Sequence, residues 1–353
     1  MLKYFAIILF SILGLTACQE SGEKSKTTST SSNKALPSST GGVDEIMFVY
    51  PDHYDEEDFN ELINENFREF YKILPQATPR FKISTVKASQ MNSLLYRFRN
   101  SIFITTYDGK DPIVGMANEA LGAEKLDEKK SLYFKRNIWA KNQLITFLIA
   151  EDFKALPKTI EKYAENIKSV ISDSELTAYK SLTYMNGVNT KIKEQLSEAY
   201  GFTIDIPLNY KIADNEKNFV SFRTDTEKST IFMFFDVKKH ESLPEDKNKG
   251  LAWRNERGTY VSSNLENTYM TTDTTLGYFT TRKEKDNFII YETRGLWTMV
   301  NDFMGGAFIN HYIIDTENNQ TILLDGFVFG PGEKNKLKLM RQFEAIFSTF
   351  KRS

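Results

Sequence analysis

The spacing of apolar residues changes near residue 200 of the chain. Before that point, short apolar runs alternate with longer segments in which apolar residues recur every three or four positions. Such a pattern is typical of strands followed by helices. Beyond it, short runs with strict alternation of apolar and polar residues follow one another, which is typical of β-hairpins. The pattern therefore predicts an α/β half over 43–200 and an antiparallel half over 201–353.

The first half opens with a predicted strand at 46–50, followed by a helix that extends to Leu74. Asp55 is the expected N-cap, and the acidic residues after it favour the positive end of the helix dipole. Pro75 is expected to end the helix, because proline disrupts the helical hydrogen-bond pattern. The remaining predicted elements are strands at 81–86, 101–105 and 139–150, a short helical piece at 91–95, a polar connection over 108–130, and interrupted helices over 157–200.

The second half reads as consecutive strands at 202–206, 219–223, 230–237, 277–282, 287–293, 307–314 and 321–329. Turn-forming residues at 285–286 and 316–319 join neighbouring strands as hairpins. A final helix after Gly332 carries Leu337, Met340 and Phe343 on one apolar stripe. Helices packed on an antiparallel sheet place the whole chain in the α+β class.

Residues 1–17 have the layout of a cleavable secretory signal. Lys3 precedes an apolar run at 4–13, which is shorter than the roughly 20 residues that a membrane-spanning helix needs. The apolar run is followed by the motif Leu15, Thr16, Ala17 and Cys18, which resembles bacterial lipoprotein signals. The resemblance implies cleavage before Cys18 and lipidation of its sulfur; an ordinary signal peptide is the alternative.

The segment 18–42 is rich in Ser, Thr, Lys and Gly and has almost no large apolar side chain. It therefore predicts a flexible tether with a reach of roughly 25 to 30 Å. The residue after Cys18 is Gln19 rather than the Asp that often retains such lipoproteins in an inner membrane. We therefore expect lipid anchoring in an outer membrane, with the protein facing the periplasm or the cell surface.

Charge and cysteine content narrow the possible functions. The chain has 45 basic and 47 acidic residues, so we expect no nucleic-acid partner. Cys18 is the one cysteine in the sequence, so the mature protein has no internal disulfide, thiol nucleophile or thiolate metal site.

Several short motifs lie at 295–297, 302–306, 326–328, Pro331 and 340–345, and further ones lie in the first half at 74–75, 97–100, Trp139, Ala140 and Gln143. Together they resemble an uncharacterised lipoprotein family of Bacteroidetes-type bacteria, domain of unknown function 4837. The resemblance thus extends over nearly all of the chain after the tether. It implies no activity, because the family has no established catalytic residues.

Motifs for covalent or metal chemistry are missing from the sequence. There is no Gly-x-Ser-x-Gly elbow, no phosphate-binding Walker loop and no His-Glu-x-x-His zinc motif. His53, His240 and His311 are far apart in sequence, and the acidic cluster at 52–58 is explained by the start of a helix. We therefore predict no catalytic residue, no metal ligand and no cofactor.

The strongest candidate for a binding site is the segment 294–306. Its possible binding residues are Arg294, Trp297, Asn301, Asp302, Gly305 and Gly306. An exposed aromatic ring beside Arg and Asp suits a sugar, a peptide or an anionic ligand. The alternative is that Trp297 and Met304 fill the core while the paired glycines turn the chain.

Taken together, these features predict a non-enzymatic envelope lipoprotein that binds an unknown envelope protein or glycan. The alternative is a hydrolase of envelope polymers that uses dispersed carboxylates such as Asp302 and Glu292. Two carboxyl groups within about 5 to 10 Å of each other would favour that alternative.

Overall fold

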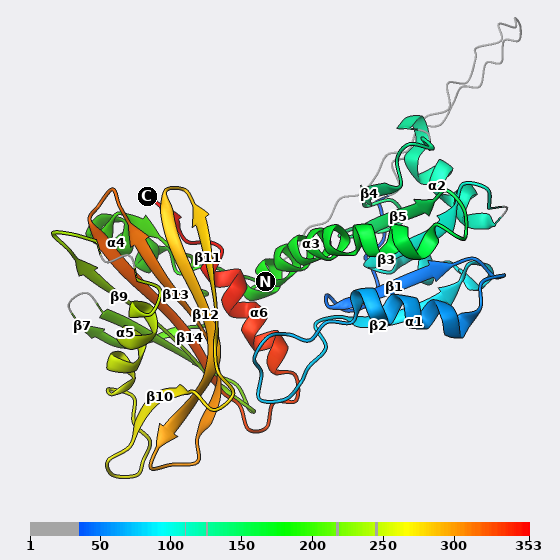
Figure 1. Ribbon diagram of the computed structural model, residues 1–353. Coiled ribbons are helices and arrows are strands. Elements are labelled where there is room, and N and C mark those ends of the chain that lie inside the picture. The colour runs from blue at the N-terminus through cyan, green and yellow to red at the C-terminus, as the bar shows by residue number, and fades with distance from the viewer. Residues whose placement is uncertain (1–34, 110, 125, 217–218, 244–245) are drawn as a thin grey trace, which may run out of the picture. The chain divides into compact units, whose positions relative to one another are not determined.

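A computed structural model describes residues 35–109, 111–124, 126–216, 219–243 and 246–353. The predicted signal, Cys18 and most of the tether lie outside these residues. Leu36–Ser353 forms one compact unit that contains both sheets and their cores. Helices pack on a mixed sheet in the first half and on an antiparallel sheet in the second, which confirms the α+β class (Figure 1). No described helix is both long and apolar enough to cross a bilayer.

The first sheet has the strand order β2-β1-β3-β5-β4. Its strands are β1 (Glu45–Tyr50), β2 (Lys82–Lys87), β3 (Asn100–Thr106), β4 (Leu132–Arg136) and β5 (Leu144–Ala150). All neighbours pair in parallel except β4, which runs antiparallel at the edge. The central strands β3 and β5 are buried along their whole length, as expected for a sheet covered on both faces.

Three helices cover this sheet. α1 (Glu56–Phe67) and α3 (Leu156–Thr183) share one hydrophobic core with it, and α2 (Pro112–Leu121) packs in a second core on the other face. Short 3₁₀ turns at Ala88–Gln90, Leu95–Arg97 and Gly122–Glu124 complete the first half. The predicted polar connection over 108–130 was wrong in part, because it contains α2. Asp111 caps α2 by accepting a hydrogen bond from the Ile113 amide at 2.8 Å.

Helix α1 is shorter than the apolar spacing predicts. Asp55 caps it as expected, accepting from the amides of Glu57 and Asp58 at 2.8 and 3.1 Å. The helix ends at Phe67 rather than Leu74, and Tyr71 and Leu74 pack in the core of the second sheet. The spacing beyond Phe67 therefore reflects burial in a different core, so the prediction of one continuous helix was wrong.

The predicted strand at 139–150 is also too long, because β5 begins at Leu144. The Gln143 side chain accepts hydrogen bonds from the amides of Trp139 and Ala140 at 3.0 and 3.1 Å. These bonds hold the preceding residues in a turn. The antiparallel edge strand β4, which comes before this turn, was not predicted.

The second sheet has the order β10-β12-β13-β14-β9-β8-β7, and β11 also pairs with β12. Its strands are β7 (Lys211–Glu216), β8 (Phe219–Asp225), β9 (Thr230–Lys239), β10 (Tyr269–Asp273), β11 (Phe279–Lys285), β12 (Phe288–Val300), β13 (Gly305–Asp315) and β14 (Gln320–Phe329). The predicted hairpins are confirmed, since Lys285 pairs with Phe288 and Asp315 with Gln320 across the two expected turns. β7 and β10 were not predicted.

Helices cover both faces of this sheet as well. α4 (Thr190–Tyr200) and α6 (Lys336–Phe347) share one core with it, and α5 (Lys249–Gly258), which was not predicted, packs on the opposite face. The predicted strand at 202–206 is reduced to β6 (Phe202–Thr203), which pairs with the final strand β15 (Lys351–Arg352).

The long helix α3 takes part in both halves of the fold. Its residues Ile160, Ile167 and Ile171 pack in the core of the first sheet. Further along the same buried stripe, Glu175 and Tyr179 lie against Arg341 of α6. This change from apolar to charged side chains marks the place where the candidate site begins.

Candidate functional site

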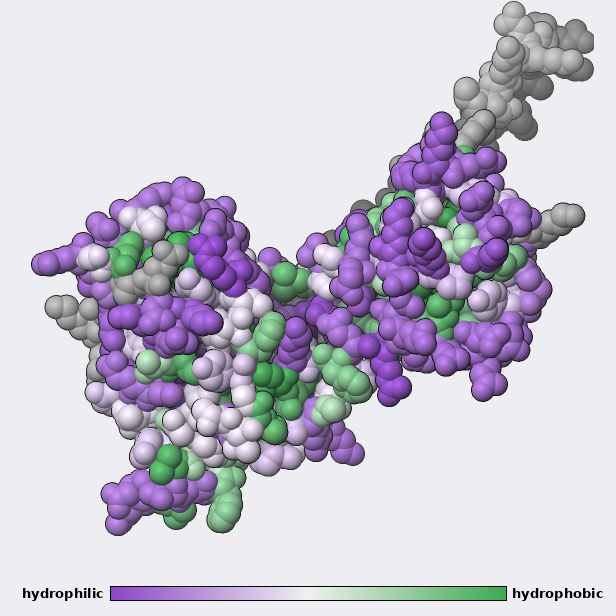
Figure 2. All heavy atoms as spheres, viewed as in Figure 1, coloured by the Kyte–Doolittle hydropathy of each residue, from purple (hydrophilic) through white to green (hydrophobic). Residues whose placement is uncertain are grey.

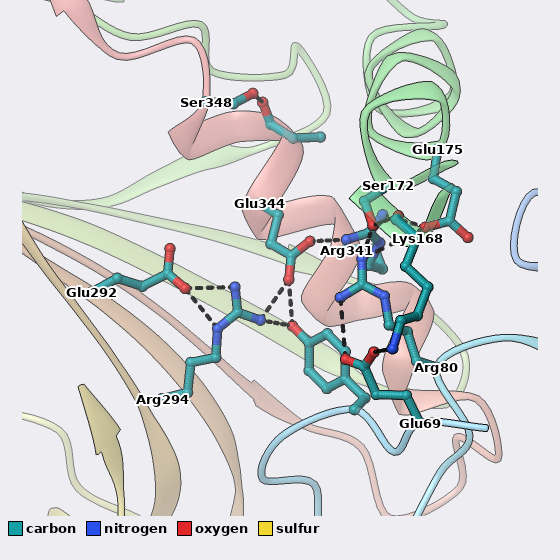
Figure 3. Close-up of polar contacts among 12 residues, drawn as sticks. Glu69, Arg80, Lys168, Ser172, Glu175, Glu292, Arg294, Arg341, Glu344 and Ser348 are labelled. Carbon is teal, nitrogen blue, oxygen red and sulfur yellow. Dashed lines mark hydrogen bonds and ion pairs between the residues drawn. The ribbon is translucent and has the colours of Figure 1, made fainter. Parts of the chain in front are cut away.

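A group of charged side chains and one tyrosine lies where α3, α6, β12 and the loop after α1 meet (Figure 3). We define it as the ion-pair cluster, and its members are Tyr71, Glu175, Glu292, Arg294, Arg341 and Glu344. Secondary structure explains the local grouping. Glu292 and Arg294 are two apart on β12 and share one face, whereas Arg341 and Glu344 are three apart and share one side of α6.

Arg294 is the centre of the ion-pair cluster. Its Nε and Nη2 atoms lie 2.8 and 2.7 Å from Glu292 Oε1, and its Nη1 contacts both Glu344 Oε1 and the Tyr71 hydroxyl. Tyr71 in turn donates a hydrogen bond to Glu344 at 2.6 Å. Burial lowers the pKa of Arg294, but the neighbouring Tyr71, Glu344 and Glu292 outweigh it and raise the pKa. Arg294 is therefore held as a cation, and each of its three nitrogens contacts an acceptor.

The two carboxylates beside Arg294 are both held ionised. Burial opposes ionisation of Glu344, but the charges of Arg294 and Arg341 lower its pKa. Burial likewise opposes ionisation of Glu292, yet the hydrogen bond to His311 and the charge of Arg294 lower its pKa below the usual range. His311 Nε2 and Lys283 Nζ lie 3.0 and 2.8 Å from Glu292 Oε2.

The other end of the ion-pair cluster reaches α3. Arg341 contacts Glu344 through Nη1, and its Nη2 donates to Glu175 Oε2 at 2.8 Å. Arg80 lies further away, with its Nη2 3.9 Å from the same oxygen. Burial raises the pKa of Glu175 to about 7, although Arg341 and Arg80 both lower it. Glu175 is thus the one member of the ion-pair cluster whose pKa lies near neutrality.

A cavity of about 560 Å³ opens beside the ion-pair cluster. Most of its lining comes from four elements. They are α3 (Ser172, Asp173, Leu176), the β11–β12 hairpin (283–285, Ile290, Glu292, Arg294), β13 (His311) and α6 (Arg341, Glu344, Phe347). The cavity therefore presents paired carboxylates and guanidinium groups next to apolar side chains. Because the ion pairs fix these groups in place, a polar ligand meets donors and acceptors that need little reorganisation.

The structure separates the residues of the predicted segment 294–306. Arg294 lines the cavity, but Trp297 is three positions further along β12 and therefore points to the opposite face of the sheet. Trp297 is 2% exposed and donates its indole N–H to the Val328 carbonyl at 3.0 Å. Its placement fits the alternative interpretation, in which the ring fills the core.

The remaining predicted site residues lie at the β12–β13 turn. Asn301 adopts a positive φ of 61°, and Asp302 is half-buried. A Cβ added at Gly306 would lie 2.0 Å from the Val328 carbonyl oxygen, and one at Gly305 would lie 2.8 Å from the Trp297 carbonyl oxygen. The paired glycines thus allow close approach of neighbouring strands. Of the six predicted residues, Arg294 alone is among those lining the described cavity.

Comparison with protein families assigns the second half of the chain. Residues 189–349 match the model described as Domain of unknown function (DUF4837). This segment is a DUF4837 domain. Residues 39–183 match a different model, Domain of unknown function (DUF8532). The resemblance to domain of unknown function 4837 is therefore confirmed for the second half, whereas the first half matches its own family model.

Other comparisons add little. No curated protein matches the chain. Solved structures similar to it include the Ran-binding protein Mog1p of Saccharomyces cerevisiae, with 9% identity and a TM-score of 0.29, covering 44% of this chain and 92% of that one. Human StAR-related lipid transfer protein 5 has 8% identity and a TM-score of 0.22, covering 51% and 95%. Likenesses at these TM-scores carry no argument about function.

The DUF4837 domain contains a second buried charged group, on the face of its sheet that α5 covers. Arg254 Nε lies 2.8 Å from Asp325 Oδ2, and both side chains are 0% exposed. The Arg254 guanidinium stacks on Phe308 at 3.8 Å, and Asn310 donates to Asp325 at 3.1 Å. Full burial makes this group part of the scaffold that holds α5 on the sheet.

The three histidines of the chain remain apart in the structure. His311 lies in the DUF4837 domain beside Glu292, His240 Nε2 is 2.7 Å from Thr321 Oγ1, and the His53 ring packs edge-on against Phe153. Among the residues that the structure describes, no three His, Cys, Asp or Glu side chains are grouped as metal ligands.

Sequence reasoning missed most of the ion-pair cluster, although signals for two members were present. Glu175 occupies a core position in the helical repeat of α3, four residues after Ile171. Arg341 follows Met340 within the apolar stretch of α6 and is itself buried. A charged residue at a buried helical position predicts an ion pair, because an unpaired buried charge is costly.

Proposed function

We propose that this protein is a lipid-anchored binding module of the cell envelope, attached to the outer membrane through Cys18. The lipoprotein-like motif that ends at Cys18 supports the anchor, and the folded part would then face the periplasm or the cell surface. In this proposal the cavity beside the ion-pair cluster holds the ligand, and no reaction takes place there.

The observation that carries the proposal is the pairing of the charges in the cavity. Five charged residues of the lining are each bound to a partner of opposite charge, namely Lys283, Arg294, Arg341, Glu292 and Glu344. Such a lining favours a ligand without net charge that both donates and accepts hydrogen bonds. The hydroxyl groups of a neutral envelope glycan meet this requirement, and the volume of about 560 Å³ suits a small saccharide.

The alternative, a hydrolase that uses Asp302 and Glu292, has less support. These residues are ten positions apart along β12 and its turn, which at about 3.3 Å per residue separates them by roughly 30 Å. Glycoside hydrolysis needs two carboxyl groups within about 5 to 10 Å, one of which carries a proton. Glu292 and Glu344 both contact Arg294 and so lie close enough, but the lowered pKa of each makes both poor proton donors.

Calorimetric titration with neutral mono- and disaccharides tests the proposed cavity. Asp173 is exposed at its edge, so Asp173→Trp places a large ring there without removing a core side chain. We expect the wild type to bind at least one neutral sugar and Asp173→Trp to lose that binding. The matched variant Asp173→Ala should retain it. Equal binding by wild type and Asp173→Trp would place the ligand elsewhere.

The lipid anchor has its own test. Cys18→Ala removes the sulfur that acylation requires, so we expect the precursor to remain uncleaved or to be sorted wrongly. Immunoblotting of membrane and soluble fractions measures both outcomes. A Cys18→Ala band of mature size that still fractionates with membranes would contradict the anchor at Cys18.

A further inference from the structure

Two neighbouring loops at one end of the second sheet carry exposed apolar side chains. One is the β12–β13 turn at 301–304, and the other is the loop 259–268 between α5 and β10. They lie together because Asn301 Nδ2 donates to the Asn267 carbonyl at 2.9 Å and Tyr269 pairs with Val300. We call these two loops, together with Tyr269, the aromatic tip.

The aromatic tip exposes four large side chains. Phe303 has a relative exposure of 108%, Tyr260 75%, Leu265 57% and Tyr269 41%. Figure 2 shows hydrophobic and hydrophilic residues mixed at the projecting lower left end of the molecule, where these loops lie in Figure 1. Single exposed apolar residues are ordinary, but several together on adjoining loops mark an interaction surface.

The turn that carries Phe303 is held in one conformation. The amide of Met299 donates to the Met304 carbonyl at 2.9 Å, and the amide of Asp302 donates to the Met299 carbonyl at 3.3 Å. The Phe303 amide in turn donates to Asp302 Oδ1 at 2.7 Å. The ring is therefore presented to solvent by an ordered hairpin. Asn301 and Asp302, which the sequence singles out as binding residues, position this ring.

The charge of the aromatic tip distinguishes between possible partners. No Lys or Arg occurs in 258–281 or in 295–333, and the tip carries the acids Glu266 and Asp302. The nearby Arg257, whose guanidinium lies 5.8 Å from the Tyr260 ring, is paired with Asp236. A surface of this kind gains nothing from anionic lipid head groups. Tyrosine, phenylalanine and leucine beside polar Asn and Ser are instead typical of segments that enter the interfacial layer of a bilayer.

We propose that the aromatic tip inserts Phe303, Tyr260 and Leu265 into the interfacial layer of a membrane of zwitterionic lipids. The inference rests on the proposed lipid anchor, since that anchor keeps the folded part within reach of a bilayer. Insertion of the tip then gives a second membrane contact, which fixes the orientation of the cavity relative to the lipid surface. The contact is independent of acylation, so it is measurable on a protein without lipid.

Residues 36–353, produced without the acylated segment, are suited to the test because they contain both complete cores. Phe303→Trp introduces a reporter at the tip, and wild-type protein supplies the background from the native tryptophans. With phosphatidylcholine vesicles we expect a blue shift of the additional emission and quenching by brominated lipid. Emission of Trp at position 303 that does not change at saturating lipid would overturn the proposal.

Vesicle flotation compares variants that preserve the fold. Phe303→Ser should weaken partitioning by about tenfold, because one fully exposed aromatic ring no longer enters the lipid. Leu276 is 67% exposed in the β10–β11 connection and is the matched control, so Leu276→Ser should partition like wild type. Equal losses in both variants would contradict a specific tip.

Sedimentation of the same proteins without lipid addresses a second copy of the chain as the partner. A wild-type dimer that Phe303→Ser converts to a monomer would overturn the lipid proposal in favour of self-association. Because no lipid anchor is present in these experiments, failure of tip insertion is distinguishable from failure of the anchor, which Cys18→Ala tests separately.

Discussion

Two buried charged groups on opposite faces of one sheet differ in what surrounds them. The Arg254–Asp325 pair lies under α5 with both side chains 0% exposed, and its contacts stay within the second half. Arg294 and Glu344 of the ion-pair cluster keep 15% and 12% of their side-chain surface exposed and line a cavity. The same sheet thus carries one group that is purely scaffold and one that a ligand can reach.

The two buried groups also differ in the number of partners that each carboxylate contacts. Asp325 meets one cation and one amide, whereas each carboxylate of the ion-pair cluster contacts at least two partners from different elements. The network spans α3, β12, α6 and the loop after α1, so removing one partner costs less free energy of unfolding than it does in an isolated pair. This redundancy is what allows polar side chains to line a cavity while the fold stays intact.

The comparison predicts its largest effect at Arg254. Arg254→Ala leaves Asp325 buried without a cation, so we expect the free energy of unfolding to fall by about 3 to 5 kcal/mol. Urea unfolding measures the loss. Combining Arg254→Met with Asp325→Leu removes both charges and should recover much of the stability. A loss below about 1 kcal/mol in the single variant would show that this pair is not scaffold.

Arg294→Ala should destabilise the protein less, by about 2 to 3 kcal/mol, because Glu292 keeps Lys283 and His311 and Glu344 keeps Arg341. The same urea titration supplies the measurement. Asp302→Ala at the half-buried β12–β13 turn is the control and should cost less than about 1 kcal/mol, because no ion pair of Asp302 is among those that the structure describes. A loss for Arg294→Ala as large as that for Arg254→Ala would erase the distinction between the two groups.

The pH dependence of stability sharpens the comparison at Glu175. Its pKa is raised from 4.5 to about 7 in the folded state, so its stabilising contribution is fully present below pH 4.5 and is lost as the pH rises through 7. Arg341, Arg80, Glu344 and Asp44 are the charged groups that act on it. We expect Glu175→Gln to abolish this pH-dependent part of the stability, which is on the order of 3 kcal/mol.

Thermal unfolding at several pH values between 4.5 and 8 tests this expectation. The wild-type curve should decline relative to that of Glu175→Gln as the pH rises. Parallel curves for the two proteins would mean that Glu175 titrates at its ordinary pKa and that the pairing with Arg341 outweighs burial.

The sequence predicts the strands and hairpins of the second half well because their alternation and their turns are local signals. The same reasoning fails at Tyr71, since its helical spacing comes from packing in a distant core. The short helix α2 escaped notice although Asp111 and Pro112 mark its start.

The candidate site was only partly predictable. Arg294 was singled out because it lies at the end of a strand rich in polar residues, close to an aromatic residue and paired glycines, but nothing local in the sequence indicates its partners. The hydrogen bond between Tyr71 and Glu344 joins residues 273 positions apart. Contacts of this kind arise when the loop after α1 packs against α6 and β12. The periodicity of a single segment carries no information about such packing.

The central claim is that the cavity beside the ion-pair cluster binds a neutral glycan without altering it. The most direct measurement is capture of neutral saccharides from an envelope digest on immobilised wild-type protein, followed by mass spectrometry of what is eluted. We predict that one saccharide is retained by wild type and Asp173→Ala, is lost from Asp173→Trp, and is recovered with its mass unchanged. Recovery of cleaved products, or equal retention by Asp173→Trp, would contradict the account.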